Sequence, residues 1–567
     1  MASDLEGRVQ SSESIANPDQ HNTPDKGFSG VSGKIKFLLL YFALCFAVLC
    51  QALDNTIIAT AIPTITDDFN SLSDVGWYGS GYLFSTCAFQ LSYGKLYNLF
   101  PIKWVFLTAL GIFEVGSLVC GAAPSSIGLI MGRVVAGIGT GGIFAGATLI
   151  VANSVPLEQR PMYNGGLASM YAIASVAGPL MGGAFTEYVT WRLCFYINLA
   201  FGAVTATAVL LFMAKQDPEK NPRWSLSIRE KIKELDLIGL VAFWPTIICL
   251  LLALQWGNSE YHWRNARIIV LFVLSGLGFG VFVATQIWQK DRAIVPLSVV
   301  RERAVWASAL YSFFLFGSFL VVAYYLPIYF QAIKGDTATE SGIHNLPSIL
   351  GNTVFSLVAG GMVFGFGYYT WACIVSSILA AVGSGLLSTL TEQSDSAYWI
   401  GYQTLYGAGI GFGLQQPLIA IQTALPDHQV SEGTAIMIFV QTFGGTVFIA
   451  VAQNVFNNKL IENVIAQHIP VNPAALLSQG ALQISKLVEP QFLDELKYAY
   501  NKSLTQTFYV PVATAGLSIL GSVFIPWLSV RKAKKPLETE ATNSEDMNTE
   551  RVEKTSREKP ITVTTLV

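Results

Sequence analysis

Two ionisable side chains lie inside long apolar stretches of the sequence, where the chemistry open to them is proton binding and release. Asp54 lies in an apolar stretch that begins near Phe37, and Arg133 lies in the glycine-rich stretch 129–142. A charge at membrane depth costs about 3 kcal/mol or more, so such a side chain is paired, protonated or exposed to a water-filled path. We interpret Asp54 as a proton-sensitive switch. We interpret Arg133 as the cation that keeps a nearby carboxylate deprotonated until a proton or substrate displaces it.

A structural role is the alternative for each of these residues. Asp54 could be a polar contact that only positions its helix, and Arg133 could donate hydrogen bonds to backbone carbonyls of adjacent helices. Glu114, in a third apolar stretch, has the same two interpretations, but no general motif supports a functional one. All three residues are therefore kept as candidates for proton coupling.

The composition indicates the kind of protein that must position these side chains. The chain has 567 residues, of which 52% are hydrophobic and 13% charged, whereas about 25% of the residues in a soluble domain are charged. The net charge of -3 is too small to suggest a polyanionic partner, and no basic patch with interspersed aromatic residues points to nucleic acid. The sequence predicts an all-α polytopic membrane protein in contact with the lipid bilayer.

Fourteen apolar segments are long enough to cross a bilayer, which takes about 20 residues in a helix. An even number of spans places both termini on one side. Lysine and arginine are concentrated in loops on that side, such as 214–236 and 531–535, so both termini are predicted to be cytoplasmic. The predicted spans are 37–62, 77–97, 104–123, 126–152, 164–187, 194–213, 237–256, 267–288, 304–330, 342–364, 367–390, 398–421, 433–455 and 507–529.

These spans suggest two six-helix halves with two inserted helices between them. Residues 37–213 form the first half, 237–288 the inserted helices and 304–529 the second half. The cytoplasmic linker 214–236 could form an amphipathic surface helix, and the long extracellular loop near 456–506 is expected to fold as short helices. Residues 1–36 and 530–567 read as disordered cytoplasmic tails. The first span is expected to be retained, because no cleavable signal peptide precedes it.

A repeat supports the two-half organisation. Positions 133 and 403 differ by 270, and the same offset relates a set of glycines and a proline in the fourth and twelfth spans. Two parallel repeats around a site near the midplane are typical of transporters. The counterpart of Arg133 is the neutral Gln403, so we expect coupling in the first half and the substrate path in the second. The matched residues are Arg133, Gly137, Gly139, Gly141 and Pro156 with Gln403, Gly407, Gly409, Gly411 and Pro426.

Four ordered motifs resemble those of the fourteen-helix drug:proton antiporters of the major facilitator superfamily. Residues 53–63 (L-D-N-T-I-I-A-T-A-I-P) resemble the first-helix signature, and 129–141 resemble the fourth-helix pattern with its arginine. Residues 178–183 (G-P-L-M-G-G) resemble the fifth-helix antiporter motif, and 191–198 the turn that follows it. The resemblance is strongest to fungal exporters of toxins, secondary metabolites and drugs. It implies the major facilitator fold, with 6+2+6 helices around a central cavity, and a part for Arg133 in proton coupling.

The fifth-helix motif acts through backbone geometry. Pro179 bends its helix, while Gly178, Gly182 and Gly183 let another helix approach closely. We expect that approach across the interface between the halves, where the resemblance implies that it restricts leak.

The loop after the second span departs from the family pattern G-x-x-x-D-R-x-G-R-R. It runs from Gly94 to Lys103, and Asn98 stands where the family has an acidic residue. We therefore expect a neutral hydrogen bond at best in this cytoplasmic gate loop. The outward-open state would then be held less strongly.

Aromatic and amide side chains in the second half are candidates for the substrate path. They would suit a mid-sized amphiphilic compound through ring stacking and a few directional hydrogen bonds. The alternative is that most of them face lipid or pack against helices. The candidates are Tyr324, Tyr325, Gln331, Gln403, Tyr406, Gln415 and Gln416.

Other kinds of site are disfavoured. The sequence has no G-x-x-x-x-G-K-[ST] loop for ATP, and its five histidines and seven cysteines lack the spacing of metal ligands. Asn501 begins an N-x-S sequon and is a weak candidate for glycosylation. We expect no enzyme activity, no metal and no cofactor, with a proton gradient as the energy source.

These observations predict a proton-coupled exporter of a small organic molecule, acting as a monomer by alternating access. The plasma membrane is the expected location, with a vacuolar or vesicular membrane as the alternative. Two other functions stay open: proton-coupled uptake of a metal chelate such as a siderophore, and a non-transporting membrane sensor or scaffold.

Overall fold

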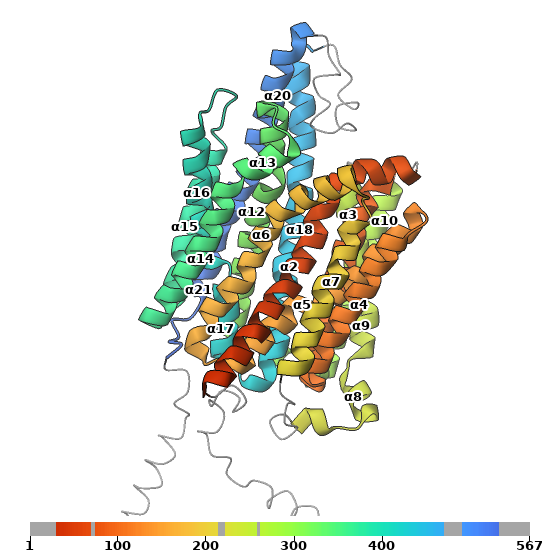
Figure 1. The fold of residues 1–567 in the computed structure, drawn as a ribbon, viewed down its shortest axis with the longest axis vertical. Helices are drawn as coiled ribbons and strands as arrows, with labels where there is room; N and C mark the ends of the chain where they lie inside the picture. Colours follow the sequence, from red (N-terminus) through yellow and green to blue (C-terminus); the bar gives the residue numbers. More distant parts are fainter. Residues whose placement is uncertain (1–29, 70–73, 214–221, 258–260, 470–489, 532–567) are drawn as a thin grey trace, which may run out of the picture.

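The protein is a bundle of long tilted helices (Figure 1), seen in a computed structural model that describes residues 30–69, 74–213, 222–257, 261–469 and 490–531. The predicted tails and the remaining connections lie outside the described residues. The first half has six helices: α2 (Gly30–Phe69), α3 (Val75–Leu99), α4 (Ile102–Ala122), α5 (Ser126–Ser154), α6 (Arg160–Tyr188) and α7 (Leu193–Phe212), with a short 3₁₀ turn, Leu157–Gln159, before α6.

The linker and the inserted helices follow. They comprise the 3₁₀ turn η6 (Pro222–Ser225), α8 (Ile228–Glu234), α9 (Leu237–Trp256) and α10 (Ala266–Gln289), then a 3₁₀ turn, Lys290–Arg292, and α11 (Leu297–Arg301). Asp236 joins α9 to the end of α10, because its buried carboxylate accepts hydrogen bonds from Gly239 N (2.8 Å), Gln286 Nε2 (3.0 Å) and Ile294 N (3.0 Å).

The second half repeats the first. Its spanning helices are α12 (Arg303–Tyr329), α14 (Leu346–Phe366), α15 (Thr370–Leu387), α16 (Ser396–Gly413) continued by α17 (Gln416–Ala424), α18 (Asp427–Ala466), and α20 (Leu493–Thr507) continued by α21 (Tyr509–Phe524). Shorter pieces are a π-helical turn, Phe330–Lys334, α13 (Ala338–His344) and a 3₁₀ turn, Pro490–Phe492.

The two halves are packed alike. The pairs α2–α6, α4–α5, α3–α5 and α2–α7 recur in the second half as α12–α18, α15–α16, α14–α16 and α12–α21. Between the halves, α3 packs on α18 and α6 packs on α14. These are equivalent crossings under the 270-residue offset, so the fold is built from the parallel repeats that the sequence predicts.

Glycines explain how α4 and α5 come so close. A Cβ added at Gly139 would lie 2.5 Å from the Ala109 carbonyl oxygen, and one added at Gly132 would lie 2.8 Å from Cys120 N. Only a residue without a side chain fits at such distances, so the glycine spacing read from the sequence sets the packing of α5.

The predicted number of fourteen spans is not confirmed. Twelve helices of the described chain are long and apolar enough to cross a membrane, and α3 and α16 are not among them. Both predicted segments are helical, but α3 carries polar groups that bond to α5, such as Gln90 Nε2 to Gly141 O (2.7 Å) and Tyr97 Oη to Gly142 O (2.8 Å). Helix α16 ends at Gly413, before α17 continues the segment.

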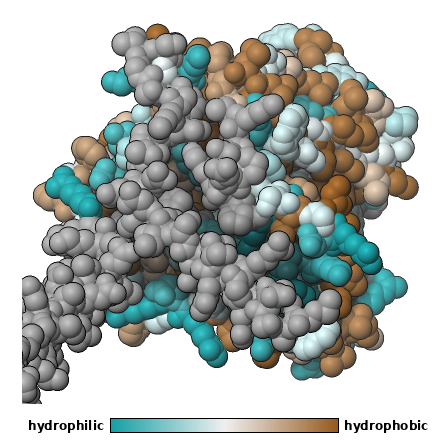
Figure 2. Space-filling model, turned by 90° about the horizontal axis from the view of Figure 1, so that it is seen from below, coloured by the Kyte–Doolittle hydropathy of each residue, from teal (hydrophilic) through white to brown (hydrophobic). Residues whose placement is uncertain are grey.

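The surface suits a bilayer. Apolar side chains reach the outside along the peripheral helices (Figure 2), among them Val273, Leu277 and Phe279 of α10. The polar groups that carry the site lie between helices instead.

The described part of the loop near 456–506 is helical, as expected, although its first part is an extension of α18 and not a separate short helix. Helix α18 simply continues to Ala466 and α20 begins at Leu493, and the two project together beyond the bundle (Figure 1). They are tied by Asn463 Nδ2, which donates to Ser503 Oγ at 2.9 Å. Residues 470–489 lie outside the described chain.

Asn501, the weak candidate for glycosylation, is buried in the folded chain. Its side chain is only 7% exposed on α20 and donates to the Leu390 carbonyl at 3.3 Å.

Within the described part of the linker, the expected helix forms only over α8, and η6 is a 3₁₀ turn. Ser227 caps α8, and hydrogen bonds from its hydroxyl and backbone N–H hold the pKa of Glu230 below its usual value. Lys231 Nζ donates to the Trp224 carbonyl (2.9 Å) and lies 4.7 Å from the ring centre of Phe100. The linker is thereby fixed to the end of α3.

Candidate functional site

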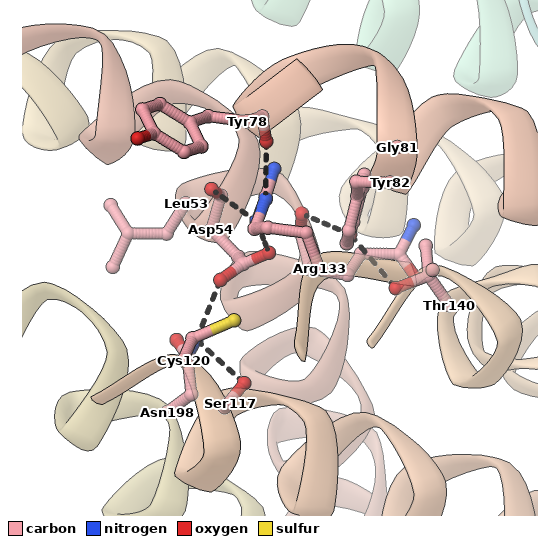
Figure 3. A network of polar contacts seen from close by, with 12 residues as sticks. Leu53, Asp54, Tyr78, Gly81, Tyr82, Ser117, Cys120, Arg133, Thr140 and Asn198 are labelled. Carbon is pink, nitrogen blue, oxygen red and sulfur yellow. Dashed lines mark hydrogen bonds and ion pairs between the residues drawn. The ribbon is translucent and has the colours of Figure 1, made fainter. Parts of the chain in front are cut away.

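A buried ion pair in the first half joins the two residues that the sequence singles out (Figure 3). The Arg133 guanidinium on α5 pairs with Asp54 Oδ2 on α2, and the two side chains are 0% and 1% exposed. Arg133 Nε also donates to the Tyr78 carbonyl at 2.7 Å. The pair therefore holds α2, α3 and α5 together and keeps a charge-compensated carboxylate in the interior.

Asp54 has a second donor from a fourth helix. Asn198 Nδ2 on α7 donates to Asp54 Oδ1 at 3.1 Å and lies 3.2 Å from Ser117 Oγ on α4. Both carboxylate oxygens are therefore bonded, one to a cation and one to an amide. Asn198 ends a motif of the sequence, but nothing in its local pattern predicted this role.

The guanidinium also lies over an aromatic ring. Arg133 Cζ is 4.3 Å from the ring centre of Tyr82, which suits a cation–π contact. The Tyr82 hydroxyl donates to the Gln51 carbonyl (3.1 Å) and accepts from Thr140 Oγ1 (2.8 Å). The contact of Tyr82 with Arg133 could not be predicted from the sequence, since an aromatic residue in an apolar span carries no distinguishing signal.

Glu114 lies outside this hydrogen-bonded network. Its side chain is half-buried on α4, and neither carboxyl oxygen has a hydrogen-bond partner among the described residues. It lies against α7 where Gly202 leaves room for it, and it is near enough to Asp54 for the two groups to interact electrostatically. The structure thus places a second carboxyl group beside the pair without joining it.

A tyrosine of the other half lies near the ion pair. Tyr324 of α12 is 49% exposed, yet close enough to Arg133 for an electrostatic interaction. Tyr324 is also the repeat counterpart of Asp54, since 54 + 270 = 324. On the first half, Tyr171 of α6 is 38% exposed and accepts a hydrogen bond from Gln51 Nε2.

The other substrate-path candidates are placed differently. Tyr325 is buried against Phe456, with ring centres 5.7 Å apart, and the Tyr406 hydroxyl is bonded to Ser318 Oγ (3.1 Å). Gln403 is fully buried and donates to the His344 carbonyl (2.9 Å). These three side chains pack within the second half, which agrees with the alternative that the candidates pack against helices. The remaining candidates are Gln331, which is half-buried, and Gln415 and Gln416, which are buried at the α16–α17 break.

The fifth-helix motif does not pack across the halves as expected. A Cβ added at Gly182 would lie 2.5 Å from the Ile57 carbonyl oxygen, and one at Gly178 would collide with Thr56, so both glycines face α2 of the same half. Gly183 has nothing within 4 Å of such a Cβ. Pro179 lies inside α6. The face of α6 that contacts α14 lies further towards the N-terminus, so the motif brings α6 onto the helix that carries Asp54.

The gate loop is held by Glu432, a residue that no pattern in the sequence marks. Glu432 of α18 accepts from Lys95 Nζ (2.7 Å) and Asn98 Nδ2 (2.8 Å) of α3, and Arg223 Nη1 of the linker lies 3.9 Å away. The expectation of a neutral hydrogen bond at best is therefore wrong, because the acceptor is a carboxylate and the bond is charge-assisted. Gly94 allows this approach, since its added Cβ would lie 3.4 Å from Glu432 Cα.

Lys103, the last residue of the predicted gate loop, bonds to the end of α7. Its Nζ donates to the carbonyls of Leu210 (2.9 Å) and Met213 (2.8 Å) at the end of α7. A lysine at the C-terminus of a helix satisfies carbonyls that have no partner within the helix, so Lys103 ties two helices of the first half.

Comparison with known proteins agrees with this architecture. Residues 44–449 match the model of the family described as Major Facilitator Superfamily. The chain is 67% identical over 455 residues to the MFS-type efflux pump elcC of Phaeosphaeria nodorum, covering 80% of this chain and 81% of that one. It is 48% identical over 508 residues to the efflux pump aflT of Aspergillus parasiticus, covering 89% and 98%.

Solved structures show the same fold at low sequence identity. The proton:xylose symporter XylE, bound to 6-bromo-6-deoxy-D-glucose, is similar with a TM-score of 0.55 at 14% identity, covering 88% of this chain and 98% of that one. The human organic anion transporter MFSD10 (TETRAN) is similar with a TM-score of 0.53 at 13% identity, covering 84% and 99%. The chain is therefore a multi-pass membrane protein and belongs to the major facilitator superfamily, a family of small-molecule transporters and not of enzymes.

Proposed function

We propose that this protein exports a small organic molecule, a secondary metabolite or toxin, in exchange for protons by alternating access. The direction follows the relatives, two of which bear the name efflux pump and share about half or more of their residues with this chain. A proton gradient supplies the energy, and no other cofactor is required. The protein acts as a monomer in the plasma membrane.

The buried Asp54–Arg133 pair carries the coupling part of this proposal. Protonation of Asp54 removes the charge that holds the guanidinium, and the Asn198 amide then faces a neutral group instead of a carboxylate. Arg133 Nη2 has no hydrogen-bond partner among the described residues, so the freed guanidinium can turn towards a substrate beside Tyr324. Proton binding at Asp54 thereby changes how Arg133 interacts with substrate, which couples the two binding events.

The gate contacts support an outward-facing place for this conformation in the proposed cycle. Glu432 ties α18 to α3, which closes one end of the bundle, hereafter the Glu432 end. The basic linker lies at this end, so it faces the cytoplasm by the positive-inside rule. The conformation is accordingly the one in which substrate has been carried outward and protons reach Asp54 from outside.

Transport into inside-out membrane vesicles tests the proposal. Vesicles from yeast that express the chain, with an acidic lumen, are incubated with an extract of fungal metabolites, and the accumulated compounds are identified by mass spectrometry. We expect one or a few compounds to accumulate, and a protonophore or Asp54→Asn to abolish accumulation at matched protein levels. Accumulation that survives both treatments would show that Asp54 does not couple transport to protons.

The same assay separates the alternatives. Uptake of a metal chelate predicts movement of the ferric complex out of preloaded vesicles, towards the cytoplasmic face. A sensor or scaffold predicts no flux of any compound under either gradient.

A further inference from the structure

Four buried polar residues on helices at the junction of the halves have side-chain atoms without a hydrogen-bond partner among the described residues. They are Asn164 on α6, Gln415 in the turn after α16, Gln422 on α17 and Thr434 on α18, and we call this group the polar seam. Asn164 and Thr434 are 0% exposed, and the two glutamines are 5% exposed. The unpartnered atoms are both side-chain polar atoms of Asn164 and of Gln422, Oε1 of Gln415 and Oγ1 of Thr434.

Two of these residues occupy equivalent positions at the two crossings between the halves. At one crossing, an added Cβ at Gly165 of α6 would meet Ser356 of α14 at 3.3 Å. At the other, an added Cβ at Gly94 of α3 would meet Ala435 of α18 at 2.7 Å. Gly165 and Ala435 are 270 residues apart, and so are their neighbours Asn164 and Thr434. The repeat therefore sets one unpartnered side chain beside each crossing.

The glutamines lie near the two ends of α17, a helix that contacts α6 of the first half. Gln415 and Gln422 are seven residues apart, which places them on one side of a helix. Leu418 lies between them on that side, and it belongs to the same hydrophobic cluster as Leu149 and Val151 of α5. The seam is thus lined from both halves at the Glu432 end.

Buried polar atoms without partners are uncommon in folded proteins, because each has given up its hydrogen bonds to water. Four such residues beside the contacts between the halves are consistent with an interface that opens. In this conformation it is held shut by the hydrogen bonds that Glu432 accepts from Lys95 and Asn98. When those bonds break, the halves can part and the seam groups can bind water or solute.

We propose that the polar seam is the site where substrate first binds from the Glu432 end. The proposal rests on the proposed function only in requiring that this end opens during transport. The seam offers amides and a hydroxyl, which both donate and accept hydrogen bonds and carry no charge. It suits an uncharged organic molecule that bears carbonyl and hydroxyl groups.

Cysteine accessibility tests the seam directly. Gln422→Cys and Asn164→Cys are each treated with a charged methanethiosulfonate reagent in membranes open on both sides, first with Glu432 intact and then with Glu432→Gln. We expect the labelling rate to rise at least tenfold when the gate is weakened. Ser518→Cys is the matched control, since Ser518 is 0% exposed in the second half and bonded to Ser377 Oγ (2.7 Å) away from the seam. Its rate should stay at the background set by the native cysteines.

A second gate variant shows whether the effect of Glu432→Gln comes from the broken ion pair and not from misfolding. Lys95→Gln removes the other member of the ion pair and should raise seam labelling in the same way. If both gate variants elute as folded protein and the two seam cysteines label no faster than the control, the seam does not line an opening path and the proposal fails. Labelling needs no transported substrate, so this result is independent of whether transport is coupled to protons.

The binding part has its own measurement. Using the metabolite found in the vesicle assay, Gln422→Leu should raise KM several-fold when substrate is supplied from the cytoplasmic face. An unchanged KM would leave the seam as a water-lined passage and would refute its role in substrate binding.

Discussion

Restoring the acidic residue that the family has at position 98 should break the gate of this protein. Asn98 Nδ2 donates to Glu432 Oε1 at 2.8 Å, and Lys95 Nζ lies 2.7 Å from the same oxygen. Asn98→Asp would replace that donor with a second carboxylate at hydrogen-bond distance. We therefore expect this substitution to destabilise the conformation that is closed at the Glu432 end.

The magnitude follows from two contributions. Loss of a hydrogen bond to a charged group costs about 1.5–3 kcal/mol. Repulsion between two unit charges about 4 Å apart adds up to about 4 kcal/mol at an effective dielectric constant of about 20. Lys95 offsets part of the repulsion, because its ammonium group lies beside both carboxylates. A net cost of about 3 kcal/mol would shift the ratio of closed to open conformations by roughly a hundredfold.

Distances between spin labels at the Glu432 end can measure this shift. Trp104 at the start of α4 and Phe366 at the end of α14 are 60% and 64% exposed, and they belong to different halves. Labels on Trp104→Cys and Phe366→Cys, in a background without the half-buried Cys249, should give one dominant short distance. Asn98→Asp should add a longer distance as the main population.

A double variant provides the control. Asn98→Asp combined with Glu432→Gln exchanges the amide and the carboxylate, so a charge-assisted hydrogen bond can form again and the short distance should return. If Asn98→Asp leaves the distances as they are, or if the exchange does not restore them, the gate does not depend on this hydrogen bond.

Three further predictions concern the first half and α20. Asp54→Asn should lower the melting temperature in detergent, because removal of one partner of a buried ion pair costs about 3–5 kcal/mol, and adding Arg133→Gln should recover part of the loss; equal melting of all forms would contradict the buried pair. Gly182→Ala should destabilise the protein, since its Cβ would lie 2.5 Å from a backbone oxygen of α2, whereas Gly183→Ala, with nothing within 4 Å, should not; similar melting of the two variants would refute this packing. Asn501→Gln should leave electrophoretic mobility unchanged with and without glycosidase, because Asn501 is buried. A glycosidase-sensitive band that is lost in the variant would show that Asn501 is glycosylated.

The sequence predicted the local features of this protein well. All fourteen apolar segments coincide with helices or helix pairs, because the length and hydropathy of a span are written in consecutive residues. The offset of 270 residues predicted the repeat, since equivalent helices keep their glycines where other helices approach. Asp54 and Arg133 stood out because ionisable groups are rare in spans.

Contacts between distant segments could not be predicted in this way. Glu432 lies 334 residues from Asn98, and Asn198 lies 144 residues from Asp54. Neither partner has a local pattern that marks it. Helical periodicity also leaves open which neighbour a given face will meet, which is why Gly178 and Gly182 were assigned to the interface between the halves when they face α2.

The sequence by itself thus determined a membrane-embedded helical repeat with ionisable residues inside the spans of its first half, because composition and spacing act over single helices. Only the tertiary structure decided that Arg133 pairs with Asp54 and that Glu432 closes one end. It also decided that the polar seam has side-chain atoms without hydrogen-bond partners in the described part of the chain. These features depend on the relative placement of the two halves, which the packing of many helices fixes together and no single segment encodes.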